Sequence, residues 1–258
     1  MDLQLKGKTA LVTGSTAGIG LAIATTLAAE GARVIVNGRT QARVDRAVRS
    51  AGATAGLAAD LGTEAGASTL IERYPEVDIL VNNLGIFEAK PFEEIADAEW
   101  RRFFDVNVLS GVRLSRHYLP AMKRKNWGRI VFISSESGLQ IPKEMIHYGM
   151  TKTAQLAVSR GLAETTAGTG VTVNSVLPGP TASEGVTGFV EGLAESQGVD
   201  KATVEREFFE KMRPTSLIRR FATPEEVASM VAFVCSPLAA AVNGAALRVD
   251  GGVARLVL

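Results

Sequence analysis

The sequence predicts an α/β fold with one doubly wound, seven-stranded parallel sheet and helices on both faces, forming three layers in a single domain over residues 1–258. Two observations carry this prediction. Short apolar runs, typical of buried parallel strands, alternate with helical patterns along the chain, and this order favours helical crossovers within one sheet. No linker rich in Pro, Gly or Ser and no internal repeat divides the chain, whose length suits one large domain.

The first part of the chain predicts four strands that alternate with three helices. The apolar run Thr9–Thr13 is the first strand. Ile19, Ile23 and Leu27 then have helical spacing, and Gly31 is placed to end that helix. The next elements, by the same criteria, are a strand at Arg33–Asn37, a helix at Thr40–Ala51, a weak strand at Thr54–Ala59, a helix at Thr63–Tyr74 stopped by Pro75, and a strand at Asp78–Asn82.

The second part predicts three more helices and three more strands. These are, in order, a long helix at about Asp97–Lys125, a strand at Arg129–Ser134, a helix at about Tyr148–Thr166, a strand at Val171–Leu177, a helix at Pro224–Cys235 and a strand at Ala246–Val249. Pro178, Gly179 and Pro180 end the sixth strand abruptly, and Pro224 suits the first turn of a helix.

The segment of residues 181–223 has no strand pattern, so we expect a polar, helical insert there. We interpret it as a lid over the substrate. Its side chains equally fit helices that pack on the domain; they include Ser183, Glu184, Phe189, Phe208, Phe209 and Met212.

Charge and cysteine content exclude several classes of protein. There are 28 Lys and Arg residues against 27 Asp and Glu, a net charge of +1, which gives no electrostatic reason to expect nucleic acid as a partner. One cysteine, Cys235, excludes a disulfide framework and a cysteine-rich zinc site. No apolar run reaches the roughly 18 residues of a membrane span, and Thr9–Thr13 is too short for a signal-peptide core. We therefore expect a cytoplasmic protein that does not bind membranes.

A glycine-rich turn follows the first predicted strand. Residues 13–20 read Thr-Gly-Ser-Thr-Ala-Gly-Ile-Gly and lead into the first helix. Glycines at such a turn let the backbone approach a dinucleotide pyrophosphate, and the helix N-terminus offers free N–H groups to the phosphates. The alternative is that these glycines serve only the geometry of the turn, but the strand–turn–helix context favours a dinucleotide.

Tyr148 and Lys152 are spaced to lie on one face of a helix, and Ser135 ends the preceding strand. A lysine beside a tyrosine favours the phenolate, so we expect Lys152 to lower the pKa of Tyr148 toward the range useful for proton transfer. The alternatives are a surface helix with an unrelated Tyr and Lys, and a serine that only forms a turn.

These motifs together resemble the short-chain dehydrogenase/reductase family over essentially the whole chain. The resemblance rests on the glycine-rich turn and on further motifs in family order: Asp60-Leu61, Asn82-Asn83-Leu84-Gly85, Asn107, Ser135, Tyr148 with Lys152, and Pro178-Gly179. The sequence departs from the family at Leu84, where the family has Ala. The resemblance implies a Rossmann-type fold.

The resemblance also implies the roles of individual residues. Ser135 would position the substrate oxygen, Tyr148 would transfer its proton, and Lys152 would hold the nicotinamide ribose. Asn107, at an irregularity in the long helix, would support a water-linked relay to Lys152; its alternative is a polar helix residue with a local partner. The cofactor contacts implied are Gly14, Ser15, Thr16, Gly18, Ile19, Gly20, Arg39, Asp60, Leu61, Asn83, Leu84, Gly85, Tyr148, Lys152, Pro178, Gly179, Thr181 and Ser183.

The end of the second strand predicts the choice of nicotinamide. An enzyme for NAD presents a carboxylate there to the ribose 2′-hydroxyl, but this chain has Gly38 followed by Arg39. A guanidinium suits a 2′-phosphate, so we expect NADP(H) to be preferred and NAD(H) to be possible. Ala17, where some NADP enzymes of the family have a basic residue, counts against this, and Arg39 could instead belong to an ordinary surface turn.

We expect an NAD(P)H-dependent oxidoreductase that interconverts a ketone or aldehyde and an alcohol. One alternative is a 3-oxoacyl carrier-protein reductase. Asn126 and Thr169 replace the basic docking residues of those enzymes, although a basic run at 123–125 is close by. The other alternative is a non-catalytic nucleotide-binding scaffold, which would have no need of the four catalytic residues.

No metal is expected, because His117 and His147 are far apart and there is no cluster of acidic or cysteine ligands. The family resemblance implies a homo-oligomer, typically a tetramer, acting on a small-molecule substrate. The apolar tail at residues 254–258 could pack on a neighbouring subunit or on its own domain.

Overall fold

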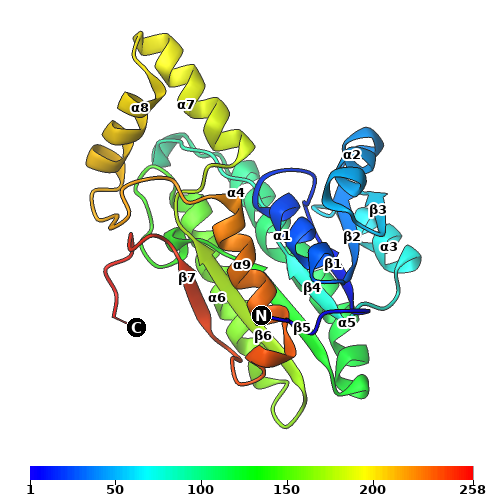
Figure 1. Ribbon diagram of the computed structural model, residues 1–258. Coiled ribbons are helices and arrows are strands. Elements are labelled where there is room, and N and C mark those ends of the chain that lie inside the picture. Colours follow the sequence, from blue (N-terminus) through cyan, green and yellow to red (C-terminus); the bar gives the residue numbers. More distant parts are fainter. Residues whose placement is uncertain (258) are drawn as a thin grey trace.

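A seven-stranded sheet, parallel throughout, forms the centre of the computed structural model, which describes residues 1–257 apart from the side chains of residues 185, 189, 193 and 197. The strand order is β3-β2-β1-β4-β5-β6-β7 (Figure 1). The strands are β1 (Thr9–Val12), β2 (Arg33–Gly38), β3 (Ala55–Ala58), β4 (Ile79–Asn82), β5 (Gly128–Ile133), β6 (Val171–Pro178) and β7 (Ala246–Val249). All seven predicted strands are confirmed, with small differences at their ends.

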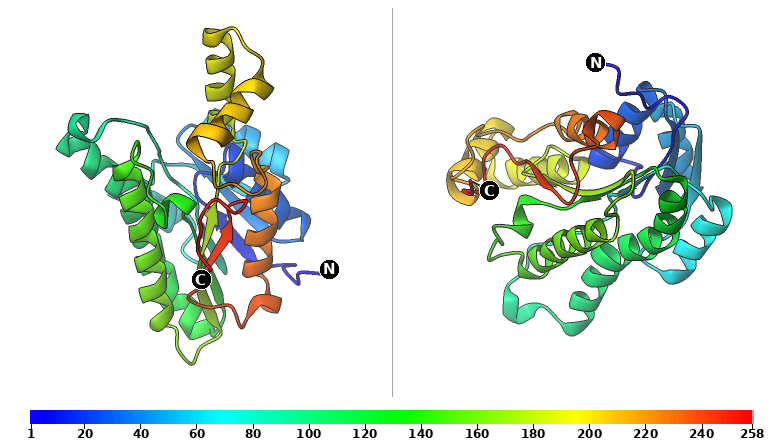
Figure 2. Two further views of the ribbon diagram at one scale, coloured as in Figure 1. Left: turned by 90° about the vertical axis from the view of Figure 1, so that its left-hand side faces the viewer. Right: turned by 90° about the horizontal axis from the view of Figure 1, so that it is seen from below.

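Helices cover both faces of the sheet, as the right-hand view of Figure 2 shows. One face carries α1 (Gly18–Ala29), α2 (Gln41–Ala51) and α9 (Pro224–Cys235), and the other carries α3 (Glu64–Arg73), α5 (Ser110–Lys125) and α6 (Ile146–Glu164). Alternate strand residues enter opposite cores: in β4, Ile79 and Val81 pack with α1 and α9, whereas Leu80 packs with α5. The predicted three-layer α/β fold is confirmed.

The long helix predicted at 97–125 contains an irregularity in its middle. It consists of α4 (Asp97–Phe104), a π-helical segment at Asp105–Leu109, and α5. The buried residue Asn107 lies inside the π-helical segment. Such segments occur frequently at functional sites.

The insert leaves the carboxyl end of β6 and stands above the sheet at the top of Figure 1. It consists of α7 (Glu184–Gln197), α8 (Lys201–Glu207) and a π-helical turn, Phe208–Met212. No strand forms in its described backbone, and a single β-bridge joins Thr181 to Ala222 at its base. The Phe189 side chain lies outside the described part.

The C-terminal tail packs on its own domain as far as it is described. Val253 and Ala254 are buried, and the Arg248 guanidinium in β7 donates to the carbonyl oxygens of Ala254 and Leu256. Val257 is exposed, and Leu258 lies outside the described residues.

Within residues 1–257, no helix is both long enough and apolar enough to cross a membrane.

Candidate active site

The glycine-rich turn between β1 and α1 is shaped by backbone that side chains would obstruct. Gly14 and Gly18 have φ values of 59° and 53°, in the left-handed region that favours glycine. A Cβ on Gly20 would lie 2.4 Å from Asn83 Nδ2 and 2.6 Å from the Gly14 carbonyl oxygen. The predicted glycines are therefore required by the geometry of the turn.

Two asparagines fix this turn to the neighbouring strands. Asn83, just after β4, donates from Nδ2 to the carbonyl oxygens of Thr13 and Gly14 at 2.9 and 3.0 Å. Asn37 in β2 accepts at Oδ1 from the Gly14 N–H at 3.3 Å. The Ser15 hydroxyl is buried and donates to the Val12 carbonyl at 2.7 Å. These bonds hold the start of α1, including Ile19, in a fixed position at the carboxyl edge of the sheet.

The end of β2 fits a phosphate better than a ribose hydroxyl. A Cβ on Gly38 would lie 2.4 Å from Thr16 Cγ2, so Thr16 fills the place that a carboxylate side chain there would need. Arg39 is exposed, and among the described residues it has no hydrogen bond or ion pair. A free guanidinium at this edge suits an anionic group.

The other predicted cofactor residues lie along the same edge. Asp60 and Leu61 follow β3, Leu84 and Gly85 follow β4, and Pro178, Gly179 and Thr181 lie at or just after the end of β6. A Cβ on Gly18 would lie 3.2 Å from Ser183 Cβ, so the first residues of the insert lie against the glycine-rich turn. A Cβ on Gly85 would lie 3.4 Å from Lys152 Nζ and 3.5 Å from Asn107 Oδ1. The predicted cofactor and catalytic residues thus meet at Gly85.

Tyr148 and Ser135 lie together at this edge. Ser135 follows β5 and accepts a hydrogen bond from the Ser137 N–H at 3.1 Å, which starts a short 3-10 turn. Tyr148 is in the first turn of α6, where a hydrogen bond with Ser135 acts to lower the pKa of its phenol. Burial and the negative charge of Glu136 outweigh this effect, so the pKa of Tyr148 is raised above its ordinary value of 10.0.

Lys152 does not act on Tyr148 in the way predicted from the sequence. Its ammonium lies 5.5 Å from the centre of the Tyr148 ring and donates to the Ile133 carbonyl at 2.9 Å and to Gln155 Oε1 at 3.3 Å. Burial lowers the pKa of Lys152 from 10.5 to about 7. The expectation that this lysine lowers the pKa of Tyr148 is wrong for the structure. Burial favours the uncharged form of Lys152, and burial of Tyr148 raises the pKa of its phenol.

Asn107 links the π-helical segment to α6 and to the loop after β4. Its Nδ2 donates to Thr151 Oγ1 at 2.9 Å and to the Ile86 carbonyl at 3.0 Å, and its Oδ1 accepts from the Ile86 N–H at 2.8 Å. The Asn107 carbonyl accepts a hydrogen bond from Gln155 Nε2. Gln155 therefore contacts both Asn107 and Lys152, and motif reasoning did not find it.

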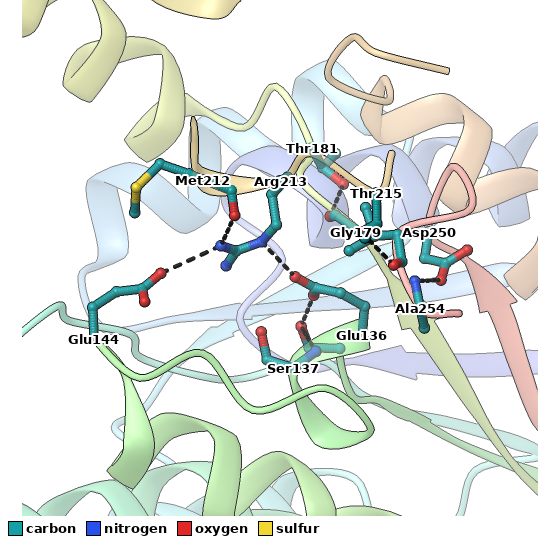
Figure 3. Close-up of polar contacts among 12 residues, drawn as sticks. Glu136, Ser137, Glu144, Gly179, Thr181, Met212, Arg213, Thr215, Asp250 and Ala254 are labelled. Atoms are coloured by element: carbon teal, nitrogen blue, oxygen red, sulfur yellow. Dashed lines mark hydrogen bonds and ion pairs between the residues drawn. The ribbon is translucent and has the colours of Figure 1, made fainter. Parts of the chain in front are cut away.

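Three charged residues that the sequence did not single out, Glu136, Arg213 and Glu144, form one group (Figure 3), and Glu136 connects it to Ser135. Glu136 Oε2 accepts a hydrogen bond from the Ser135 hydroxyl, and Arg213 of the insert reaches Glu136 from Nε at 3.3 Å. Arg213 also reaches Glu144, from the loop before α6, at 3.3 Å. A buried acid immediately after a predicted catalytic serine was the one signal that could have revealed this group.

His147 is a packing residue in the described structure. It is fully buried, with its ring centre 4.0 Å from that of Phe103 and 6.0 Å from that of Trp100. Burial lowers its pKa from 6.5. Across residues 1–257 no group of three His, Cys, Asp or Glu side chains is arranged to hold a metal ion.

The parallel sheet, the glycine-rich turn at its carboxyl edge and the Ser135, Tyr148 and Lys152 set define a dinucleotide-dependent oxidoreductase. Comparisons with known proteins agree. A family profile described as enoyl-(acyl carrier protein) reductase matches residues 14–254. The chain belongs to the short-chain dehydrogenase/reductase family, and it is an oxidoreductase of the type that acts on CH–OH and C=O groups.

Three similar proteins illustrate the range of the family. An uncharacterized oxidoreductase of Bacillus subtilis, YvaG, is 52% identical over 100% of both chains. D-beta-hydroxybutyrate dehydrogenase of Cupriavidus necator is 36% identical over 96% of this chain and 98% of its own. L-sorbose reductase of Gluconobacter frateurii, solved in complex with NADPH and L-sorbose, is 32% identical over 100% of both chains, with a TM-score of 0.94.

Proposed function

We propose that this protein is an NADP(H)-dependent reductase that converts a ketone to a secondary alcohol, with Tyr148 as the general acid. The observation that carries the proposal is the meeting of Ser135, Tyr148, Lys152 and Asn107 at the carboxyl edge of the sheet, where open α/β folds bind ligands. The same groups would serve the oxidation of an alcohol, with Tyr148 as the base.

The cofactor would lie across the glycine-rich turn, with its nicotinamide near Gly85 and Lys152. A bound nicotinamide supplies or accepts the hydride. The residues that would hold it are Gly14, Ser15, Thr16, Gly18, Ile19 and Gly20 at the turn, Arg39, Asp60 and Leu61 on the adenosine side, and Asn83, Leu84, Gly85, Tyr148, Lys152, Pro178, Gly179, Thr181 and Ser183 toward the nicotinamide. Arg39 would bind the 2′-phosphate, which favours NADP(H), while NAD(H) remains usable. The NADPH in the similar L-sorbose reductase supports this choice.

Four residues of the chain have separate parts in the proton transfer. The Ser135 hydroxyl would orient the substrate oxygen toward the Tyr148 phenol. Because burial and Glu136 raise the pKa of Tyr148, the phenol keeps its proton until the substrate oxygen gains charge and accepts it. Lys152, with a pKa of about 7, could then return a proton to Tyr148, and Asn107 holds this part of α6 in place.

A substrate panel tests the function. Oxidation of NADPH and of NADH is followed with aliphatic, cyclic, aryl and hydroxylated ketones. We expect saturable turnover of at least one ketone, faster with NADPH. Tight binding of NADPH without turnover of any carbonyl or alcohol would contradict the proposal and favour a nucleotide-binding scaffold.

The 3-oxoacyl carrier-protein reductase is the second candidate, supported by similarity to such an enzyme of Aquifex aeolicus, which is 34% identical over 98% of this chain and 100% of its own. In the basic run at 123–125, Lys125 pairs with Asp78, Lys123 donates to the Thr165 carbonyl, and Arg124 is exposed with no hydrogen bond or ion pair among the described residues. Asn126 is itself committed to the Gly170 N–H at 2.7 Å. Acetoacetyl thioesters reduced better than any simple ketone would favour this candidate.

We also propose that residues 181–223 close over the substrate as a lid. Arg43 of α2 supports this role, because its ion pair with Glu184 at 3.0 Å joins the insert to the adenosine side of the site. Assembly is a separate proposal: the family resemblance implies a homotetramer, and an apolar groove between α4 and α6, lined in part by Phe104 and Met150, offers a surface for contact between copies. Sedimentation equilibrium would reveal the number of chains. We place the protein in the cytoplasm, which cell fractionation would test.

A further inference from the structure

Glu136, Arg213 and Glu144 form a charged group that Glu136 connects to Ser135. The three come from separate parts of the chain: the turn after β5, the end of the insert, and the loop before α6 (Figure 3). Arg213 uses Nε for Glu136 and one terminal nitrogen for both Glu144, at 3.3 Å, and the Met212 carbonyl, at 2.8 Å. Its guanidinium is thus engaged by two acids of its own chain.

The burial of this group makes its charges effective. The exposed fractions of the side chains are 6% for Glu136, 13% for Arg213 and 25% for Glu144. Charges withdrawn from water interact with their surroundings more strongly than surface charges do. A ligand beside Ser135 would therefore sense the sum of these three charges.

That sum is negative, since one guanidinium faces two carboxylates. Lys90, on the adjoining loop, pairs with Glu99 at 2.7 Å and adds no free positive charge. Lys152 is directed to the Ile133 carbonyl and Gln155. At the Tyr148 phenol, the effect of Glu136 on the pKa exceeds the opposite effect of Arg213. The Glu136–Arg213–Glu144 group is therefore net negative, and at neutral pH Lys152, whose pKa is about 7, offsets this only in part.

We propose that the Glu136–Arg213–Glu144 group makes the active site select neutral ketones and disfavour ketones that carry a carboxylate. This inference rests on the proposed function and names its substrate class. A carboxylate could bind Arg213 at Nη2, which has no hydrogen bond in the described part of the chain, but it would bring a third negative charge to a single buried guanidinium. A neutral substrate leaves the group intact, and one that carries a hydroxyl or an amide N–H can donate a hydrogen bond to Glu144 Oε2.

A matched pair of ketones tests the inference with the unmodified protein. Acetoacetamide and acetoacetate have nearly the same shape and differ in one negative charge. With NADPH we expect kcat/KM for acetoacetamide to exceed that for acetoacetate by at least about tenfold. If neither is reduced, their inhibition constants against the best ketone of the panel should differ in the same direction.

Glu144→Gln removes one negative charge at the most exposed member of the group. We expect this variant to reduce the preference for acetoacetamide at least about threefold, through better use of acetoacetate. Glu94→Gln, in the exposed 3-10 turn Phe92–Glu94, is the matched control and should leave the preference unchanged.

The outcomes separate this inference from the proposed function. Equal or better use of acetoacetate by the unmodified protein would overturn the inference and leave the reductase intact. A preference for acetoacetamide that is the same in Glu144→Gln would also overturn it. Absence of turnover with every ketone would overturn the proposed function, and the inference with it.

Discussion

The pKa values of Tyr148 and Lys152, one helical turn apart, are shifted in opposite directions by the surroundings of the two side chains. Burial disfavours the charged form of each, so the pKa of the phenol rises and that of the ammonium falls to about 7. The spacing of the two residues places them on one face of α6. Burial is the largest cause of each shift, and at Tyr148 the negative charge of Glu136 adds to it.

Tyr148→Phe removes the phenol hydroxyl and keeps the ring. Because Tyr148 would transfer the proton, we expect kcat to fall by about 10²-fold or more, while the dissociation constant for NADPH changes little. Steady-state kinetics and NADPH fluorescence measure the two quantities. Tyr118→Phe is the control: it removes a hydrogen bond to the Tyr74 carbonyl and should cost about 1 kcal/mol of stability, with kcat preserved. A near-normal kcat for Tyr148→Phe would refute its role.

Arg39→Asp replaces the free guanidinium at the end of β2 with a carboxylate. We expect the ratio of kcat/KM with NADPH to that with NADH to fall by about 10²-fold, because a charge-assisted bond is replaced by repulsion. Arg49→Asp, on the exposed surface of α2, controls for the change in overall charge. An unchanged ratio in Arg39→Asp would show that the 2′-phosphate lies elsewhere.

Lys152→Met tests the effect of burial independently of catalysis. The pKa of Lys152 is about 7 when folded and about 10.5 when unfolded, so between these values the unfolded chain binds the extra proton. The contribution of Lys152 to stability therefore rises with pH across this window, by at most about 1.4 kcal/mol per pH unit, and is flat below it. Urea unfolding at pH 7.0 and 9.0 should show the wild type gaining stability relative to Lys152→Met. If the difference in unfolding free energy between the two proteins is the same at both pH values, the pKa of Lys152 is not lowered in the folded state.

At the scale of elements, the π-helical segment at Asp105–Leu109 brings the site together. Its geometry leaves the Asn107 carbonyl free to accept from Gln155, while the Asn107 side chain binds Ile86 and Thr151. The long helix, α6 and the loop after β4 are therefore joined through one residue.

Gln155→Leu should leave the buried Asn107 carbonyl without its donor. We expect a loss of about 1–3 kcal/mol of unfolding free energy and a reduced kcat, since Lys152 also loses a partner. Chemical denaturation and kinetics measure both effects. Gln155→Glu keeps an acceptor for Lys152 but not the donor, so it should lose stability with less loss of activity. Normal stability in Gln155→Leu would show that this bond does not fix the segment.

The whole molecule combines a sheet domain with an insert whose helices α7 and α8 pack mainly on each other and on the turn at Phe208–Met212. Val190, Ala194 and Val204 form a small apolar cluster within the insert. Its ties to the sheet domain include the ion pairs of Arg43 and Arg213 and the hydrogen bonds of residues 215, 217 and 218 with the backbone of residues 251–253. Segments with few buried contacts open with small free energies.

Binding of NADP⁺ should therefore slow amide hydrogen exchange in α7 and α8, by at least about threefold if the insert closes over the site. Exchange in α5, on the other side of the sheet, serves as the internal control and should not change. Equal exchange in α7 and α8 with and without NADP⁺ would contradict the lid proposal.

The sequence allowed much of this architecture to be predicted. The runs at Thr9–Val12 and Ile79–Asn82 are apolar on both sides, as strands covered on both faces must be, and Gly14, Gly18 and Gly20 occur where backbone conformation and close approach demand glycine. The insert could be recognised only by its lack of strand patterns, because nothing local specifies where its helices pack.

By itself, the sequence determined the parallel α/β fold and the identity of the groups at its carboxyl edge, because periodicity, turn residues and short spacings are local properties. The tertiary structure decided what Arg213 contacts, how Glu136 and Glu144 share it, and which way the pKa values of Tyr148 and Lys152 move. These properties depend on burial and on charges brought together from residues 136, 144 and 213. Because these residues are brought together only by folding, no local sequence pattern predicts their contacts.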